Sequence, residues 1–153
     1  MKATPLMLSL FLLACGLCGY TWQTRFVPHE GAEATQASAR VLPNGVGAAY
    51  LRLVNHGGQE DQLLSVSSPW ARAAELHEVV EEGDLLRMVA HPEGFRVPPR
   101  GSLRLEEGGK HVMLYGVSLP PGATELPLTL QLRRAGTLQL RVPLSALAGE
   151  GAP

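Results

Sequence analysis

Cysteine is scarce in this sequence, and its placement excludes several kinds of site. Only Cys15 and Cys18 occur, so the chain of 153 residues is free of cysteine beyond its first 20 residues. The downstream part therefore has no disulfide framework, no zinc-cysteine site and no thiol nucleophile. The formal charge is −1, which leaves no basic excess to neutralise phosphates. Nucleic-acid binding is therefore not expected.

No convincing amphipathic helix is found between Ala39 and Leu147. Short β-like runs separated by turn residues stand there instead: 39–42, 47–54, 62–67, 73–80, 85–90, 94–97, 102–105, 110–117, 126–133 and 137–143. Leucine alternates with other residues from Leu126 to Leu132, which predicts a strand with one buried face and one solvent-exposed face. The pattern predicts an all-β domain, a Greek-key β-sandwich or barrel of about eight or nine short strands.

Residues 1–25 have the features of an export segment. No charged residue occurs between Lys2 and Arg25, and the apolar centre covers residues 5–17. Three outcomes are open. Leu-Leu-Ala-Cys resembles a bacterial lipoprotein box, which would be cleaved before a lipidated Cys15. Alternatively, the segment is retained as an uncleaved membrane anchor, or it is cleaved and the domain is released. All three place the domain outside the cytoplasm, in the periplasm or its equivalent, and the first two tether it to the membrane.

Cys15 and Cys18 also fit a Cys-x-x-Cys redox pattern. That interpretation needs a strand-to-helix context with an activated thiol, which an apolar leader does not offer. Small and polar residues predict a tether over 26–38, followed by the β-domain over 39–147 and a disordered tail over 148–153.

Two methionines occur beyond the leader, and each has a histidine nearby. His111 and Met113 are two apart in a predicted strand, so their side chains share a face. A turn at Glu82-Gly83 would make His77 and Met88 direct cross-strand partners, unless a one-residue bulge shifts the register. If the hairpin adjoins the 110–117 strand, two imidazoles and two thioethers come together.

Such a ligand set favours a soft metal ion. Thioethers are poor ligands for zinc, magnesium or calcium, whereas they select Cu(I), which imidazole also binds. A methionine in a strand more often packs in the core, and a histidine in a strand more often lies at the surface, than either binds a metal. The alternative is therefore an exported β-sandwich that binds a ligand or protein without metal. A copper enzyme is disfavoured because two thioethers stabilise Cu(I) against redox cycling.

These residues resemble the bacterial periplasmic copper chaperone family of the PCuAC type. The resemblance covers residues 39–142. It includes the H-x10-M and H-x-M motifs, an early Y-x-x-x-x-N strand at Tyr50–Asn55, and the segments Glu75–Glu78 (ELHE) and Gly108–Leu114 (GGKHVML). Two departures are visible. The 22 residues between Met88 and His111 are one more than the common spacing, and the tail AGEGAP lacks the histidines and methionines that many members carry.

The resemblance implies a cupredoxin-like fold and a carrier rather than an enzyme. It implies one Cu(I) per chain, held by His77, Met88, His111 and Met113. It also implies delivery to another protein, typically the binuclear copper site of cytochrome c oxidase subunit II, sometimes alongside a Sco-type thiol protein. A monomer is expected.

The remaining histidines and the hairpin tip are expected to play no part in metal binding. His29, His56 and His91 are interpreted as solvated residues of the tether and loops. The acidic residues Glu81, Glu82 and Asp84 are interpreted as a solvated turn, with a docking patch as the alternative.

Overall fold

The structure is a computed structural model that describes residues 31–145. The predicted leader and tail therefore lie outside the described residues. In the described part all regular structure is β: β1 (Ala32–Val41), β2 (Gly47–Asn55), β3 (Asp61–Ser67), β4 (Ala73–Glu82), β5 (Leu85–Ala90), β6 (Phe95–Val97), β7 (Ser102–Leu105), β8 (Lys110–Tyr115), β9 (Glu125–Leu132) and β10 (Gly136–Pro143). Within residues 31–145, no helix is long and apolar enough to cross a membrane.

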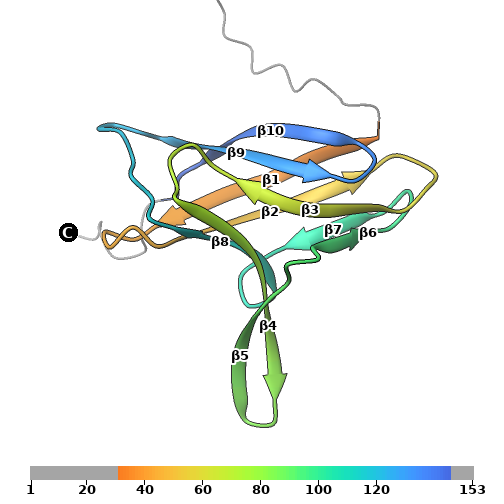
Figure 1. The fold of residues 1–153 in the computed structure, drawn as a ribbon, viewed down its shortest axis with the longest axis horizontal. Coiled ribbons are helices and arrows are strands. Elements are labelled where there is room, and N and C mark those ends of the chain that lie inside the picture. The colour runs from red at the N-terminus through yellow and green to blue at the C-terminus, as the bar shows by residue number, and fades with distance from the viewer. Residues whose placement is uncertain (1–30, 146–153) are drawn as a thin grey trace, which may run out of the picture.

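The ten strands form two antiparallel sheets (Figure 1). One sheet has the order β1-β2-β8-β4-β5, with β7 also paired to β2, and the other has the order β10-β9-β3-β6. Neighbours that are far apart in the chain, such as β2 with β8 and β3 with β9, are typical of Greek-key connections. The predicted all-β sandwich is confirmed, with one or two strands more than expected.

The core lies between the two sheets and is built mainly from leucine and valine. In β9, Leu126, Leu128, Leu130 and Leu132 are at most 2% exposed, as their alternation predicts. In β10, Leu138, Leu140 and Val142 are buried in the same way. Each such side chain contributes about 1.5–3 kcal/mol through its burial. This core fixes the sheets on which the candidate site is built.

β1 corrects the predicted boundary between tether and domain. The strand begins at Ala32, pairs with β2 along most of its length, and buries Ala32, Ala34 and Ala39. Alanine has low β-propensity, so the local sequence resembles a linker, whereas pairing with β2 makes it a strand. Of the predicted tether 26–38, residues 32–38 therefore belong to the domain, and residues 26–30 lie outside the described part.

The β4–β5 hairpin projects from the body of the molecule as a separate arm (Figure 1). Its turn is Gly83-Asp84, because Glu82 pairs directly with Leu85. Gly83 has a φ of 67°, the left-handed value that a two-residue hairpin turn needs at its first central position. The sequence-based prediction placed the turn one residue earlier and is wrong in this detail.

Candidate metal centre

His77 and His111 form the centre of the candidate site. His77 of β4 lies directly opposite His111 of β8, and their ring centroids are 6.1 Å apart. The predicted neighbourhood of the hairpin and the 110–117 strand is therefore present. Both histidines are buried, with 8% and 5% of their surface exposed. They stand on the face of the sheet opposite to Leu76 and Val112 of the core, because side chains alternate along a strand.

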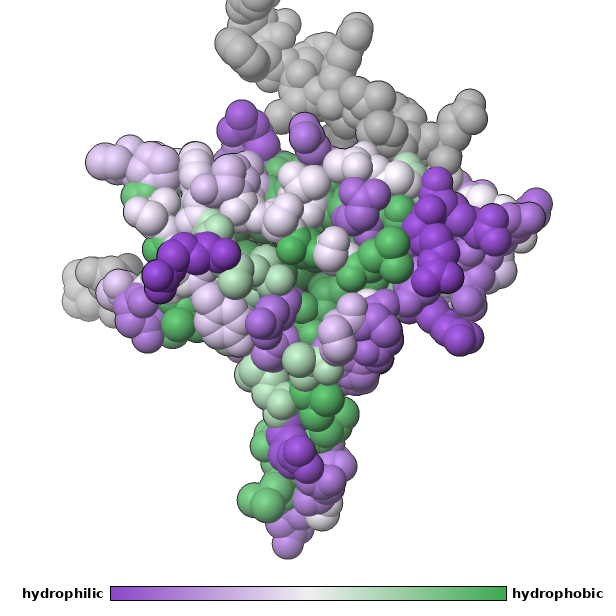
Figure 2. Space-filling view, in the orientation of Figure 1, coloured by the Kyte–Doolittle hydropathy of each residue, from purple (hydrophilic) through white to green (hydrophobic). Residues whose placement is uncertain are grey.

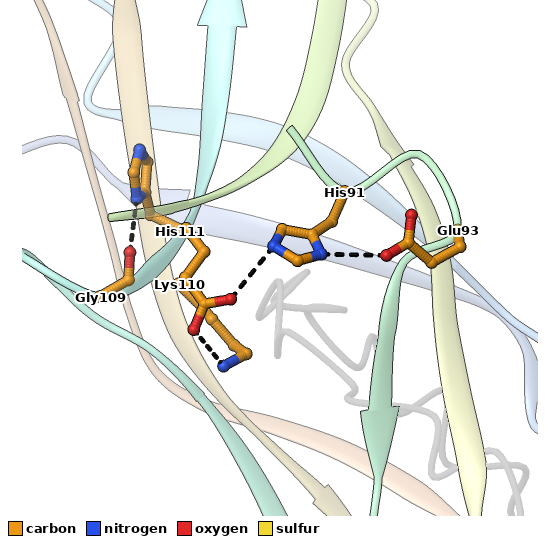
Figure 3. Close-up of polar contacts among 6 residues, drawn as sticks. His91, Glu93, Gly109, Lys110 and His111 are labelled. Atoms are coloured by element: carbon orange, nitrogen blue, oxygen red, sulfur yellow. Dashed lines mark hydrogen bonds and ion pairs between the residues drawn. The ribbon is translucent and has the colours of Figure 1, made fainter. Parts of the chain in front are cut away.

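The ring of His111 is fixed by a backbone carbonyl. His111 Nδ1 donates to the carbonyl oxygen of Gly109 at 3.0 Å (Figure 3), and the same oxygen accepts the backbone N–H of Val79 at 3.1 Å. A carbonyl can only accept, so the proton is on Nδ1 in the neutral ring. The Nε2 lone pair of His111 is then available to a ligand.

The ring of His77 has one satisfied and one unsatisfied nitrogen. His77 Nε2 is 2.8 Å from Glu75 Oε2 on the same strand. His77 Nδ1 is buried and has no hydrogen-bond partner within the described residues. Leaving a buried polar atom unpaired costs about 1–3 kcal/mol. A nitrogen in this state is suited to coordinating an ion, so the observation fits a metal centre.

The two methionines lie on the same face as the histidines, on opposite sides of them. Met113 follows His111 by two residues in β8, pairs with Glu75 and Ala48, and is partly buried. Met88 pairs with Val79 and not with His77, whose partner on β5 is Ala90. The predicted direct pairing of His77 with Met88 is therefore wrong, because the turn lies one residue later.

The register shift leaves Met88 on the face that was predicted. It lies diagonally across from His77. Diagonal neighbours of this kind are about 7–8 Å apart, which a long side chain can bridge. Met113 is diagonal to His77 across the other strand pair in the same way. Met88 is 53% exposed, which makes it the most open of the four predicted ligands.

Two tyrosines border the histidine pair. The ring centroid of Tyr50 is 6.5 Å from that of His111, and the ring centroid of Tyr115 is 6.5 Å from that of His77. Burial, and secondarily the negative charge of Glu75, raises the pKa of Tyr115. Burial, and secondarily the charge of Glu107, raises the pKa of Tyr50. Both phenols therefore stay neutral around pH 7 and bring no charge to the site.

Of the other histidines, His56 and His91 lie in the described part, and each contacts at least one glutamate. His56 is exposed at the end of β2 and pairs with Glu33, in agreement with the prediction, and His29 lies outside the described residues. His91 corrects the prediction of a solvated residue. Its side chain is 24% exposed, with Nε2 3.1 Å from Glu78 Oε2 and Nδ1 3.0 Å from Glu93 Oε1 (Figure 3).

The His91 contacts belong to a polar cluster at the base of the arm. Glu78 also accepts a hydrogen bond from Lys110 Nζ at 2.6 Å. Glu78 follows His77 in β4, so its side chain leaves the opposite face of the strand. The cluster therefore links β4, β8 and the loop after β5 and does not contribute to the candidate site.

The chemistry of the donors favours a soft ion. Two neutral imidazoles and two thioethers suit Cu(I). Zinc also binds imidazole, but thioethers are poor ligands for zinc, calcium and magnesium. Among residues 31–145, no group of three or more His, Cys, Asp or Glu side chains could hold a metal ion.

Sequence reasoning missed two groups that support the ligands. The first is Glu75, which the sequence analysis names only as part of the ELHE segment. Its position two residues before His77 in a strand places both side chains on the same face. The carbonyl of Gly109 could not be recognised from sequence, because its contact with the His111 ring depends on the backbone path of the turn before β8.

A family model described as "Putative lipoprotein LpqE-like" matches residues 32–144. The chain belongs to the LpqE-like family. Among its relatives, a protein named "Putative lipoprotein Lxx21020" from Leifsonia xyli subsp. xyli (strain CTCB07) is 28% identical over 121 residues, which cover 78% of this chain and 73% of the relative. Both descriptions are of lipoproteins.

Solved structures similar to this LpqE-like chain are PCuAC domains and related proteins. The copper-bound PCuAC domain from PmoF2 is 20% identical, with a TM-score of 0.62, and the match covers 76% of this chain and 94% of that domain. The solution structure of CuI-DR1885 from Deinococcus radiodurans is 27% identical, with a TM-score of 0.57, and the match covers 80% of this chain and 81% of that protein. The predicted PCuAC-type resemblance and the cupredoxin-like fold are confirmed.

Proposed function

We propose that this protein is an exported copper chaperone that binds one Cu(I) ion through His77, Met88, His111 and Met113. The observation that carries the proposal is the buried histidine pair, in which each ring keeps one nitrogen free for a ligand. The copper-bound state of the PmoF2 domain and the Cu(I)-bound state of DR1885 support it. Protein carriers of this kind perform no catalytic turnover, so no enzymatic activity is proposed.

The exposure of the ligands suggests how the ion is passed on. The histidines and Met113 are at least partly covered, whereas Met88 lies on the projecting arm and is 53% exposed. An acceptor can replace Met88 first and the remaining ligands one at a time, so the ion is never free in solution. Thiolates bind Cu(I) more strongly than thioethers, which gives the transfer its direction.

The proposed acceptor is the binuclear copper site of cytochrome c oxidase subunit II, with a Sco-type thiol protein as a second partner. The arm offers an apolar surface for such contacts. Leu85 and Leu86 are 69% and 71% exposed, and hydrophobic residues cover much of the arm in the space-filling view (Figure 2). Exposed apolar groups around a metal ligand favour docking of a protein that brings its own ligands.

The descriptions of the family and of the Leifsonia relative support a location at the outer side of a membrane. Cys15 in Leu-Leu-Ala-Cys is the proposed site of lipidation. The domain then begins at Ala32, 17 residues after that anchor. We propose a periplasmic or equivalent extracytoplasmic position, tethered to the membrane.

The test is a Cu(I) competition titration of the full-length chain in detergent. We expect one tightly bound ion per chain and a large loss of affinity in Met88→Leu/Met113→Leu, because leucine keeps the volume and removes the sulfur. Leu85→Ala, on the opposite face of β5 from Met88, is the control and should bind as the wild type does. Equal binding by all three, or none, would contradict the proposal and favour an exported β-sandwich that recognises a partner without metal.

A further inference from the structure

Glu75 and His77 share one face of β4 and are joined through their side chains. Glu75 Oε2 lies 2.8 Å from His77 Nε2. The side chain of Glu75 is 52% exposed and that of His77 is 10% exposed, so the carboxylate reaches from the solvent to a covered ring. An ionised carboxylate can only accept hydrogen bonds, and His77 Nε2 must therefore carry the proton.

This contact determines which nitrogen of His77 can act as a donor to a metal. In a neutral imidazole one nitrogen carries hydrogen and the other carries the lone pair. With hydrogen on Nε2, the lone pair is on Nδ1, which is buried and has no partner among residues 31–145.

His111 is held in the other tautomer. Its Nδ1–H donates to the carbonyl oxygen of Gly109 at 3.0 Å, and its lone pair is on Nε2. The two histidines of one cross-strand pair therefore present different nitrogens. The cause is local in each case: a side chain two residues before His77, and a backbone carbonyl two residues before His111.

We propose that Glu75 is a positioning residue that makes His77 an Nδ1 donor, so that the pair binds a soft metal ion through Nδ1 of His77 and Nε2 of His111. The inference rests on the proposed function. Nδ1 is closer to the backbone than Nε2, which brings the ion toward β4. This position also brings it toward Met88 on β5, the ligand that lies farthest from His111 in the sheet.

The first test is spectroscopic and needs no metal. In the full-length chain in detergent, labelled with ¹⁵N-histidine, two-bond ¹⁵N–¹H correlations at a pH where the rings are neutral report which nitrogen carries hydrogen. We expect hydrogen on Nε2 of His77 and on Nδ1 of His111. Hydrogen on Nδ1 of His77 would overturn the proposal, because the predicted donor atom would then be blocked.

Two substitutions separate the role of the acceptor from that of the charge. Glu75→Gln keeps an oxygen that accepts from Nε2–H, so the tautomer and most of the Cu(I) affinity should remain. Glu75→Ala removes the acceptor, so His77 should become a mixture of tautomers and the affinity should fall about 10- to 100-fold, the usual effect of losing such a partner. An unchanged tautomer in Glu75→Ala would refute the role of Glu75.

Glu81→Ala is the matched control. Glu81 lies on the same face of β4 as His77, four residues along, and forms no ion pair with any residue of the described part. Its removal should change neither the tautomer nor the affinity. If the wild-type tautomers are as expected but Cu(I) does not bind, the proposed function fails while the positioning role of Glu75 is supported. If Glu75→Ala does not fold, the proposal is tested by the tautomers of the wild type and of Glu75→Gln. Hydrogen on Nδ1 of His77 in either chain would overturn it.

Discussion

His77 lies directly opposite His111, with ring centroids 6.1 Å apart. An ion bonded to one ring nitrogen at about 2.0–2.1 Å lies roughly 3.2 Å from that ring's centroid. Two rings that share one ion can therefore have centroids up to roughly 6.4 Å apart. The observed separation of 6.1 Å lies within this limit, so the distance between the rings is compatible with one shared ion.

Acid is expected to weaken Cu(I) binding. Histidines usually gain their proton between about pH 8 and pH 5, and a protonated ring cannot coordinate through that nitrogen. The methionine sulfurs gain no proton, so weak binding should persist at the acidic end. Competition titrations across this interval provide the measurement, with His77→Ala/His111→Ala expected to show weak binding that does not vary with pH. A flat profile for the wild-type chain would exclude the histidines as ligands.

The two leucines near the hairpin turn should differ in their effect on copper transfer. Leu86 pairs with Glu81 and shares the face of His77 and Met88, whereas Leu85 pairs with Glu82 and points to the other face. Both are about equally exposed, at 71% and 69%, so Leu86→Ser and Leu85→Ser are matched substitutions.

We expect Leu86→Ser to slow transfer of Cu(I) to an acceptor and Leu85→Ser to leave the rate unchanged, with equal Cu(I) affinity and stability in both. Stopped-flow transfer to a soluble domain carrying the binuclear copper site provides the measurement. Equal rates for the two variants would argue against docking through the face that carries Met88.

Asp61 should make the stability of the fold depend on pH. Burial of its carboxylate raises the pKa, but backbone N–H groups of Arg134, Ala135 and Gln62 and the charge of Arg134 outweigh this, and the pKa lies below its ordinary value. The hydrogen bonds measure 2.8, 3.0 and 2.7 Å. The carboxylate thus joins the start of β3 to the turn between β9 and β10.

A lowered folded-state pKa stabilises the fold above the unfolded value of about 3.9, and this contribution is lost as the pH falls through the folded value. Asp61→Asn should therefore cost about 1–3 kcal/mol of unfolding free energy at neutral pH and lose part of the acid dependence. Urea unfolding near pH 7 and pH 3 measures both. A variant as stable as the wild type at pH 7 would show that these hydrogen bonds contribute little.

Much of the fold and of the ligand set could be predicted from local patterns. Each of the ten β-like runs overlaps a strand, because alternation and turn residues are properties of neighbouring positions. His111 and Met113 share a face in any strand, since that relationship needs no tertiary information. The turn residues Glu82-Gly83 indicated the hairpin, although the turn lies one residue later, and the partner of His77 is therefore Ala90 and not Met88.

The sequence by itself determined the all-β class, the strand positions, and which residues could bind a soft metal ion, because periodicity and side-chain chemistry are local. Only the tertiary structure decided that Ala32–Ser38 joins the domain, that β4 lies between β5 and β8, and that His77 therefore faces His111. It also decided which ring nitrogen of His77 and of His111 has no hydrogen-bond partner among the described residues, because Glu75 contacts one nitrogen of His77 and the carbonyl of Gly109 contacts one nitrogen of His111. Strand order and hydrogen-bond partners depend on residues far apart in the chain or on the path of a turn, and no local pattern encodes them.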